Sequence, residues 1–286
     1  MHAVTLSLSL LALFAGSPAE PEEAVAEAPA AEQMQLPAYF ELRVEGGKAF
    51  VAVPLEGDEG DAWSGATSGE KTFPARLDTL RPTSFVLPGG SITPGAFVGY
   101  STSGGASDMW WVIEFEAKGA REGSGLAILG DVDSPQLRNP GLVALSSATG
   151  QEQLVAIRAL LDTKLSAADR KRLGKKVLSK TRVKIIEGSF PNDATLLVSI
   201  AVPMKVEPGM SISALFTMTS DGEVATMLHA PQMRLEHYEP QSLGDVDADG
   251  LDDVVFESAY YEGRYKHLLR WSDAGPRVTT IAGDGA

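Results

Sequence analysis

The sequence predicts a mainly β protein, α+β overall, in which two β-rich halves are joined by a helical segment. Short apolar runs split by Pro and Gly occupy residues 37–150 and 181–286, whereas residues 151–180 carry apolar side chains at helical spacing. Short strands at such intervals are typical of a β-sandwich or a related sheet. We therefore expect sandwich-like or partial blade-like sheets in an N-terminal domain, a helical connector, and a C-terminal domain over these three ranges.

The first half begins with a hairpin signal. Residues 39–57 read as two strands joined at Glu45-Gly46-Gly47-Lys48, and a polar, Gly-rich loop follows at residues 58–71. Four further strands are expected at Ser84–Leu87, Ala96–Tyr100, Trp110–Glu116 and Leu126–Leu129. Short strands at such spacing favour a β-sandwich or a related sheet.

One of these strands, WWVIEFE, alternates in character along its length. Trp111, Ile113 and Phe115 share one face, and Trp110 lies on the other face with Val112. The tryptophans are compatible with a sugar-binding platform or with burial in a sandwich core. Burial is favoured, because aromatic side chains dominate such cores.

The helical connector contains apolar residues at helical spacing and a second start signal. Leu154, Ile157, Leu160 and Leu161 recur at that spacing, and Ser166 followed by Asp169 resembles a capping box. Residues 164–184 hold nine Lys and Arg side chains. This basic segment is interpreted as a solvated helix face, and an anionic envelope polymer or lipid surface is the alternative partner.

The N-terminal residues predict export. The apolar run within MHAVTLSLSLLALFAG is shorter than the roughly 20 residues that span a bilayer, and its length suits a signal peptide over residues 1–19. Residues 20–36 are rich in Ala, Glu and Pro and are expected to form a disordered acidic linker. We expect a secreted or periplasmic protein with no transmembrane segment in its mature form.

Charge and cysteine content exclude several classes of function. The formal net charge is −14, which argues against nucleic acid as a partner, because such binding needs a basic face. The chain has no Cys, so disulfides, thiolate zinc sites, iron–sulfur sites and cysteine nucleophiles are excluded.

The most specific motif is LGDVDADGLDDVVF at residues 243–256. Counted from Asp245 as position 1, positions 3, 5, 6, 7 and 9 are Asp247, Asp249, Gly250, Leu251 and Asp253. Calcium takes six to eight oxygen ligands, and alternate carboxylates on a tightly turning loop can converge on one point. Glycine permits the sharp turn, and the carbonyl of position 7 faces the ion. The motif predicts a Ca²⁺ site; the alternative is an acidic turn without metal. Asp252, at position 8, is expected to point outward.

The residues after the loop separate it from an EF-hand. Position 12 is Phe256 rather than a bidentate Glu, and the following segment reads as a β-hairpin. The pattern D-x-D-x-D-G-x-x-D before a strand resembles the calcium loops of FG-GAP and related VCBS-type, integrin-like repeats, with one intact copy here. The resemblance implies side-chain ligands from Asp245, Asp247, Asp249 and Asp253 and a carbonyl ligand from Leu251. LGDVD also occurs at residues 129–133 without the later ligands, and this copy is expected to be an ordinary turn.

These patterns favour an exported, calcium-binding, non-enzymatic module that binds an unidentified protein or glycan at the cell envelope. The alternative is a secreted hydrolase in which the calcium is structural. That alternative requires acid, base or nucleophile side chains to converge in one cleft. The residues available for such a set include Glu114, Asp131, His229, Glu236 and His237.

Overall fold

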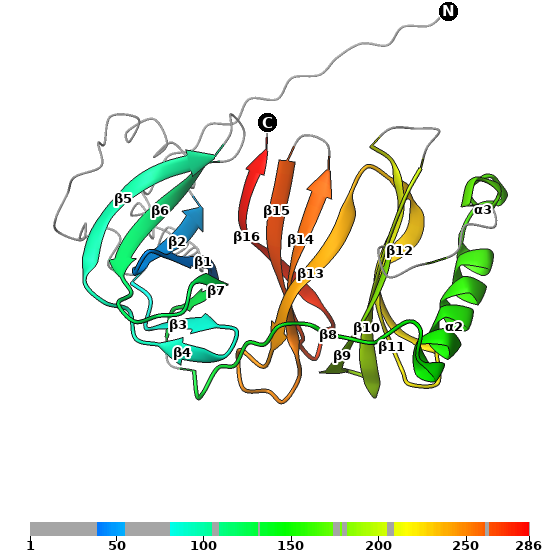
Figure 1. Cartoon of the computed structure of the whole chain (residues 1–286), viewed down its shortest axis with the longest axis horizontal. Helices are drawn as coiled ribbons and strands as arrows, with labels where there is room; N and C mark the ends of the chain where they lie inside the picture. The colour runs from blue at the N-terminus through cyan, green and yellow to red at the C-terminus, as the bar shows by residue number, and fades with distance from the viewer. Residues whose placement is uncertain are drawn as a thin grey trace, which may run out of the picture. The chain divides into compact units, whose positions relative to one another are not determined.

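The computed structural model describes residues 39–54, 81–104, 109–130, 132–173, 178, 182–204, 209–260 and 263–285. The expected signal peptide and acidic linker lie outside these residues, as does Asp131. Pro37–Ala286 forms one compact unit. Its described part contains three antiparallel sheets, which confirms the predicted mainly β class (Figure 1). Along the chain, two helices come between the strands of the first sheet and most strands of the later ones.

The first half folds into one seven-stranded sheet with the strand order β4-β3-β7-β1-β2-β6-β5. Its strands are β1 (Tyr39–Glu45), β2 (Lys48–Pro54), β3 (Ser84–Leu87), β4 (Gly90–Ile92), β5 (Phe97–Gly104), β6 (Met109–Glu116) and β7 (Gly123–Ile128). The predicted hairpin joins β1 to β2, and Gly46 and Gly47 have φ angles of +58° and +76°. Two successive residues with positive φ are what a type I′ hairpin turn requires, and glycine adopts them without strain.

This sheet curls so that strands distant in its order touch. Phe115 on β6 packs edge-on against Phe85 on β3, with ring centroids 5.7 Å apart, although three strands separate β3 from β6 in the sheet. Trp111 packs edge-on against Tyr100 on the neighbouring strand. Trp110 and Trp111 are 8% and 3% exposed, so both are buried, as expected for aromatic side chains of this sheet.

Two helices follow the short strand β8 (Gly141–Leu142): α2 (Ala148–Lys164) and α3 (Ala167–Leu173). Ser147 caps α2 by accepting a hydrogen bond from Gly150 N. Ser166 caps α3 by accepting one from Asp169 N at 3.0 Å, which confirms the predicted second start. Neither described helix combines the length and apolar character needed to cross a membrane.

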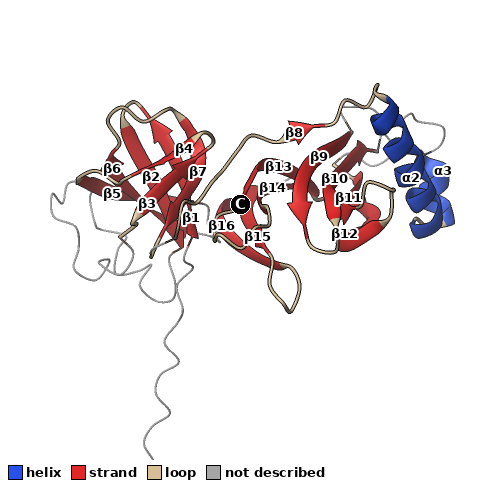
Figure 2. Ribbon diagram, turned by 90° about the horizontal axis from the view of Figure 1, so that it is seen from below, coloured by secondary structure: helices blue, strands red, loops and turns tan. Residues whose placement is uncertain are grey.

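The second half contains two sheets rather than one. β9 (Val183–Phe190), β10 (Ala194–Pro203), β11 (Ser211–Met218) and β12 (Val224–Arg234) form an antiparallel meander, with β8 added at the β9 edge. β13 (His237–Gly244), β14 (Asp253–Tyr260), β15 (Gly263–Arg270) and β16 (Arg277–Gly285) form a second meander in sequence order. Helices α2 and α3 lie beside the five-stranded sheet (Figure 2), and their apolar side chains pack into a core with this sheet.

The four-stranded sheet is buried on both faces. Val254 and Phe256 on β14 pack into the core shared with the five-stranded sheet, and Val255 between them packs into the core shared with the seven-stranded sheet. Successive side chains of a strand point to opposite faces, so a strand covered on both sides is apolar at consecutive positions. This packing explains why the acidic loop runs directly into the unbroken apolar stretch VVF.

Candidate metal centre

The acidic loop connects β13 to β14 and is shaped by its own carboxylates. Asp245 Oδ1 accepts a hydrogen bond from Asp249 N at 3.1 Å, and Asp245 Oδ2 accepts one from Gly250 N at 3.0 Å. Asp249 Oδ1 accepts one from Leu251 N at 2.8 Å. Ala248 and Gly250 have φ angles of +63° and +86°, in the left-handed region. Gly250, at position 6, therefore adopts the positive φ that the sharp turn was predicted to require.

Three of the predicted ligands come together. Asp245, Asp247 and Asp249 each offer one carboxylate oxygen, and these oxygens lie within 4.8 Å of one another. Asp253 is next to this triad but outside that distance, and it is 1% exposed at the first position of β14. Its Oδ2 accepts a hydrogen bond from Val246 N at 3.3 Å.

Two buried carboxylate oxygens at this place lack a partner. Asp247 Oδ1 and Asp253 Oδ1 are buried and have no hydrogen-bond partner among the described residues. Buried polar atoms are nearly always hydrogen-bonded, so each such oxygen requires an explanation. A cation bound between these side chains would supply the missing interaction for both oxygens.

The electrostatics of the site also favour an added positive charge. Burial, together with the nearby charge of Asp247, raises the pKa of Asp253 to about 8, although the Val246 N–H and Arg270 oppose this shift. Burial and the charge of Asp249 raise the pKa of Asp247. Both shifts mean that the ionised carboxylates lack enough compensation from water and protein groups.

Arg270 supplies the nearest described cation, and no sequence pattern indicated it. Its Nε lies 3.6 Å from Asp247 Oδ2. Its guanidinium also lies over the ring of Tyr39 on β1, 4.7 Å from the centroid. Arg270 is at the end of β15, so only the pairing of β14 with β15 brings it to the loop.

The expectation that Asp252 points outward is wrong. Its side chain is 13% exposed. Asp252 Oδ2 accepts hydrogen bonds from Arg138 Nη2 at 2.6 Å and from Ser189 N at 2.8 Å. Ser189 belongs to β9, so Asp252 attaches the loop to the five-stranded sheet. A sequence-based ligand pattern cannot contain this contact, because it depends on which sheet packs beside the loop.

Leu251 packs its partly buried side chain against the core between the two meanders. This contact explains why position 7 is apolar. The use of its carbonyl as a ligand stays a prediction.

The segment that follows the first LGDVD copy pairs with the second copy. Arg138 and Leu243 form an isolated antiparallel bridge, and Gln136 N donates a hydrogen bond to Asp245 O at 3.0 Å. A Cβ on Gly244 would lie 1.9 Å from Gln136 O, so this position accommodates only glycine. Asp133 of the first copy is exposed.

Two of the candidate hydrolase residues, His229 and Glu236, both contact Tyr238 and lie close enough for their charges to interact. His229 stacks on Tyr238 with centroids 4.0 Å apart, and Tyr238 OH donates to Glu236 Oε2 at 2.9 Å. Burial, followed by this hydrogen bond, raises the pKa of Tyr238 to about 12, so the phenol stays protonated. Glu114 lies in the other half and pairs with Lys48 at 2.5 Å.

In the described part of the basic segment, Arg170 and Arg172 contact groups of α2 and α3, whereas Lys184 pairs with Glu239 on β13. Arg170 Nη1 donates to Asp162 O at 2.8 Å, and Arg172 lies 3.5 Å from Asp169. Lys171 is exposed. Residues 174–177 and 179–181 lie outside the described residues.

Comparison of the chain with family models, with curated proteins and with solved structures finds no match.

Proposed function

We propose that residues 245–253 bind Ca²⁺ and that the ion stabilises the C-terminal sheets. The observation that carries this proposal is the pair of buried, unpartnered oxygens, Asp247 Oδ1 and Asp253 Oδ1, beside the aspartate triad. Calcium accepts six to eight oxygens in a flexible geometry, whereas magnesium demands an octahedron and retains its water. Several carboxylates on one short loop suit the larger ion, and the resemblance to FG-GAP and VCBS-type loops supports the same choice.

The protein is proposed to act as an exported, non-enzymatic binding or structural module. Extracellular calcium modules typically bind with a Kd of about 10⁻⁴–10⁻³ M, so such a site would be filled after export. Contacts of the loop with neighbouring sheets support a structural role. Asp252 contacts β9, and Arg270 bridges Asp247 and Tyr39. Binding of the ion would therefore stabilise the packing between sheets as well as the loop.

The test is a thermal melt of the full chain in EDTA, in 10 mM CaCl₂ and in 10 mM MgCl₂. At 10 mM, which is about 10–100 times this Kd, calcium adds roughly 1.4–2.7 kcal/mol to the free energy of unfolding, which corresponds to a rise of about 3–10 °C in Tm. We expect this rise with calcium and not with magnesium. Asp247→Asn should abolish it, and Asp273→Asn, at an exposed position outside the loop, should leave it unchanged. A Tm that ignores calcium, or responds equally to both ions, would refute the proposal.

A further inference from the structure

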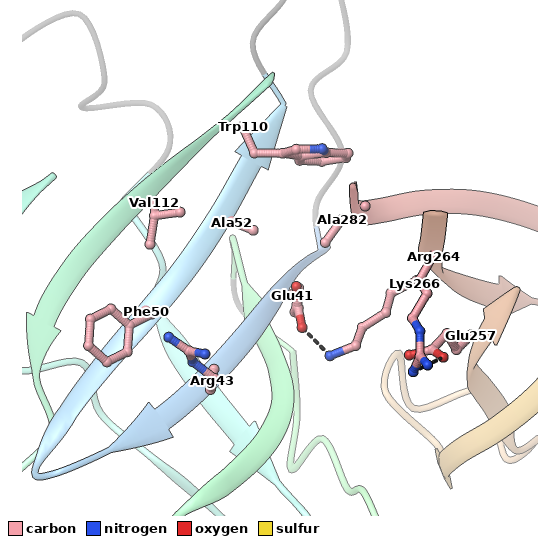
Figure 3. Close-up of a pocket in the computed structure, with 11 residues that line it drawn as sticks. Glu41, Arg43, Phe50, Ala52, Trp110, Val112, Glu257, Arg264, Lys266 and Ala282 are labelled. Carbon is pink, nitrogen blue, oxygen red and sulfur yellow. Dashed lines mark hydrogen bonds and ion pairs between the residues drawn. The ribbon is translucent and has the colours of Figure 1, made fainter. Parts of the chain in front are cut away.

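A cavity of about 350 Å³ lies between strands β1, β2 and β6 of the seven-stranded sheet and strands β14 to β16 of the four-stranded sheet (Figure 3). The side chains that give it chemical character are Glu41, Arg43, Phe50, Trp110, Arg264 and Lys266. Small-molecule sites in proteins are typically concave, about 300–1,000 Å³ in volume, and combine apolar walls with a few polar groups. This cavity has that composition, and its described lining contains no residue of the acidic loop.

The seven-stranded sheet contributes aromatic walls. Trp110 on β6 and Phe50 on β2 both line the cavity, with the small side chains of Ala52 and Val112 between them (Figure 3). Trp110 is 8% exposed, yet its indole Nε1 has no hydrogen-bond partner among the described residues. A buried indole N–H normally finds an acceptor, so this wall of the cavity holds a buried donor whose partner is not among the described residues.

The opposite side of the cavity is charged. Lys266 on β15 pairs with Glu41 on β1, and Arg264 Nη1 lies 3.2 Å from Glu257 Oε1 (Figure 3). The lining holds three cations, which are Arg43, Arg264 and Lys266, against two carboxylates, which are Glu41 and Glu257, so its formal charge is 3 − 2 = +1. The whole chain has a formal net charge of −14, so this positive cavity stands out from the rest of the protein.

Arg43 lies beside Phe50. Its guanidinium lies over the Phe50 ring, 5.2 Å from the centroid, its Nε lies 3.8 Å from Glu45 Oε2, and its side chain is 61% exposed. An arginine held over an aromatic face presents its planar fork in a defined orientation, and that fork matches a carboxylate with two parallel hydrogen bonds.

We propose that this cavity binds an acidic monosaccharide unit, a sugar that bears one carboxylate. The C–H face of a sugar ring carries partial positive charge and suits the negative face of Phe50, which is partly exposed. Its hydroxyl groups suit the carboxylates and cationic donors of the rim. One carboxylate matches the formal charge of +1, whereas a phosphate dianion would exceed it. This proposal gives a ligand class to the binding module proposed above. It rests on that proposed function only for the role of the protein as a binding module.

The test is isothermal titration calorimetry of the full chain in 10 mM CaCl₂ with D-glucuronate, D-glucose and acetate. Hydrogen bonds to charged groups contribute enough for about a tenfold difference in affinity, so glucuronate should bind about tenfold more tightly than glucose. Acetate lacks the sugar ring and should bind more weakly than glucuronate. Equal affinity for glucuronate and glucose, or for glucuronate and acetate, would overturn the proposal.

Variants assign the binding to the cavity. Arg43→Gln changes a largely exposed side chain and should weaken glucuronate binding about tenfold, with little effect on glucose. Trp110→Phe keeps an aromatic ring but makes this wall of the cavity smaller, and it should weaken both sugars. Lys171→Gln makes the same charge change at an exposed position of α3 and should alter neither affinity. If Trp110→Phe fails to fold, Arg43→Gln alone tests the site. An unchanged glucuronate affinity in Arg43→Gln refutes the site.

The sugar proposal and the calcium proposal can fail separately. Glucuronate binding that persists in Asp247→Asn would support the cavity even if calcium proved to have no effect on Tm. A calcium-dependent Tm without glucuronate binding would refute the sugar site and leave the calcium site standing.

Discussion

Arg138 Nη2 lies 2.6 Å from Asp252 Oδ2, and this ion pair joins the segment before α2 to the loop that holds the aspartate triad. The two residues are 114 positions apart in the chain. Asp252 also accepts from Ser189 N on β9. The proposed metal loop is therefore held from outside by two separate segments, so its stability should depend on residues that do not contact the ion.

Removing Arg138 should test this dependence. Arg138→Met keeps the length of the aliphatic stem but removes the guanidinium, which also donates to Glu187 O. We expect a loss of about 1 kcal/mol in the free energy of unfolding, since the pair is partly exposed and solvent weakens it. Urea denaturation in saturating calcium measures this loss, with Lys171→Met as the matched control. An Arg138→Met variant as stable as the control would contradict the proposed role.

Two glycines of the loop region should respond to alanine for different reasons. Gly250 has φ of +86°, and a Cβ at this position would meet only open space, so Gly250→Ala should cost about 1 kcal/mol through backbone strain alone. A Cβ on Gly244 would lie 1.9 Å from Gln136 O, so Gly244→Ala should cost about 3 kcal/mol by separating packed backbone segments. Denaturant midpoints of the two variants check this order, and equal losses would count against the close approach.

Asp253→Asn should have opposite effects with and without calcium. Without the ion, the substitution removes a buried carboxylate that lies beside Asp247, and the amide oxygen can still accept from Val246 N. We expect the variant to be more stable than the native chain in EDTA at pH 9, by about 1 kcal/mol. In calcium the order should reverse, because a ligand has been lost. Thermal melts of both proteins in EDTA and in calcium test for this reversal of order. A variant that is less stable than the native chain in both solutions would exclude it.

His267 should make the protein sensitive to acid. Burial lowers its pKa, as does the charge of His229, while Glu236 opposes them. Its Nε2 lies 2.8 Å from Ser258 Oγ and its Nδ1 lies 3.2 Å from Thr280 Oγ1. The folded state therefore favours the neutral ring. The unfolded chain binds the proton more readily, so stability is complete above about pH 6.5 and is lost as the pH falls below it.

The variant His267→Gln should reduce this loss. Urea midpoints of both proteins between pH 7.5 and 5, in saturating calcium, measure the difference. The native chain should lose more stability than the variant over this range. A parallel pH dependence in the two proteins would show that His267 is not the group responsible.

Features encoded in contiguous residues were predicted successfully. The turn at Gly46-Gly47, the cap at Ser166 and the grouping of Asp245, Asp247 and Asp249 each depend on side chains a few positions apart. Local hydrogen bonds and allowed φ values determine such features, so they can be inferred without knowledge of the rest of the fold. The mainly β class followed in the same way from the length and alternation of the apolar runs.

Features that depend on packing between distant segments were missed. Nothing in the order of residues separated the second half into two sheets, because an apolar strand such as β14 has the same pattern whichever layers cover it. The contact of Asp252 with Arg138 and the placement of Arg270 beside Asp247 arise only when those layers pack. The same is true of the cavity between Trp110 and Lys266, whose walls come from two sheets.

The sequence alone thus determined many of the strands, the start of α3 and a loop of carboxylates suited to a cation, since these follow from local geometry and side-chain chemistry. The tertiary structure alone decided which faces are buried, which buried oxygens of Asp247 and Asp253 lack partners, and which charges surround them. Desolvation depends on all the atoms that exclude water from a group, and most of those atoms belong to residues remote in the chain.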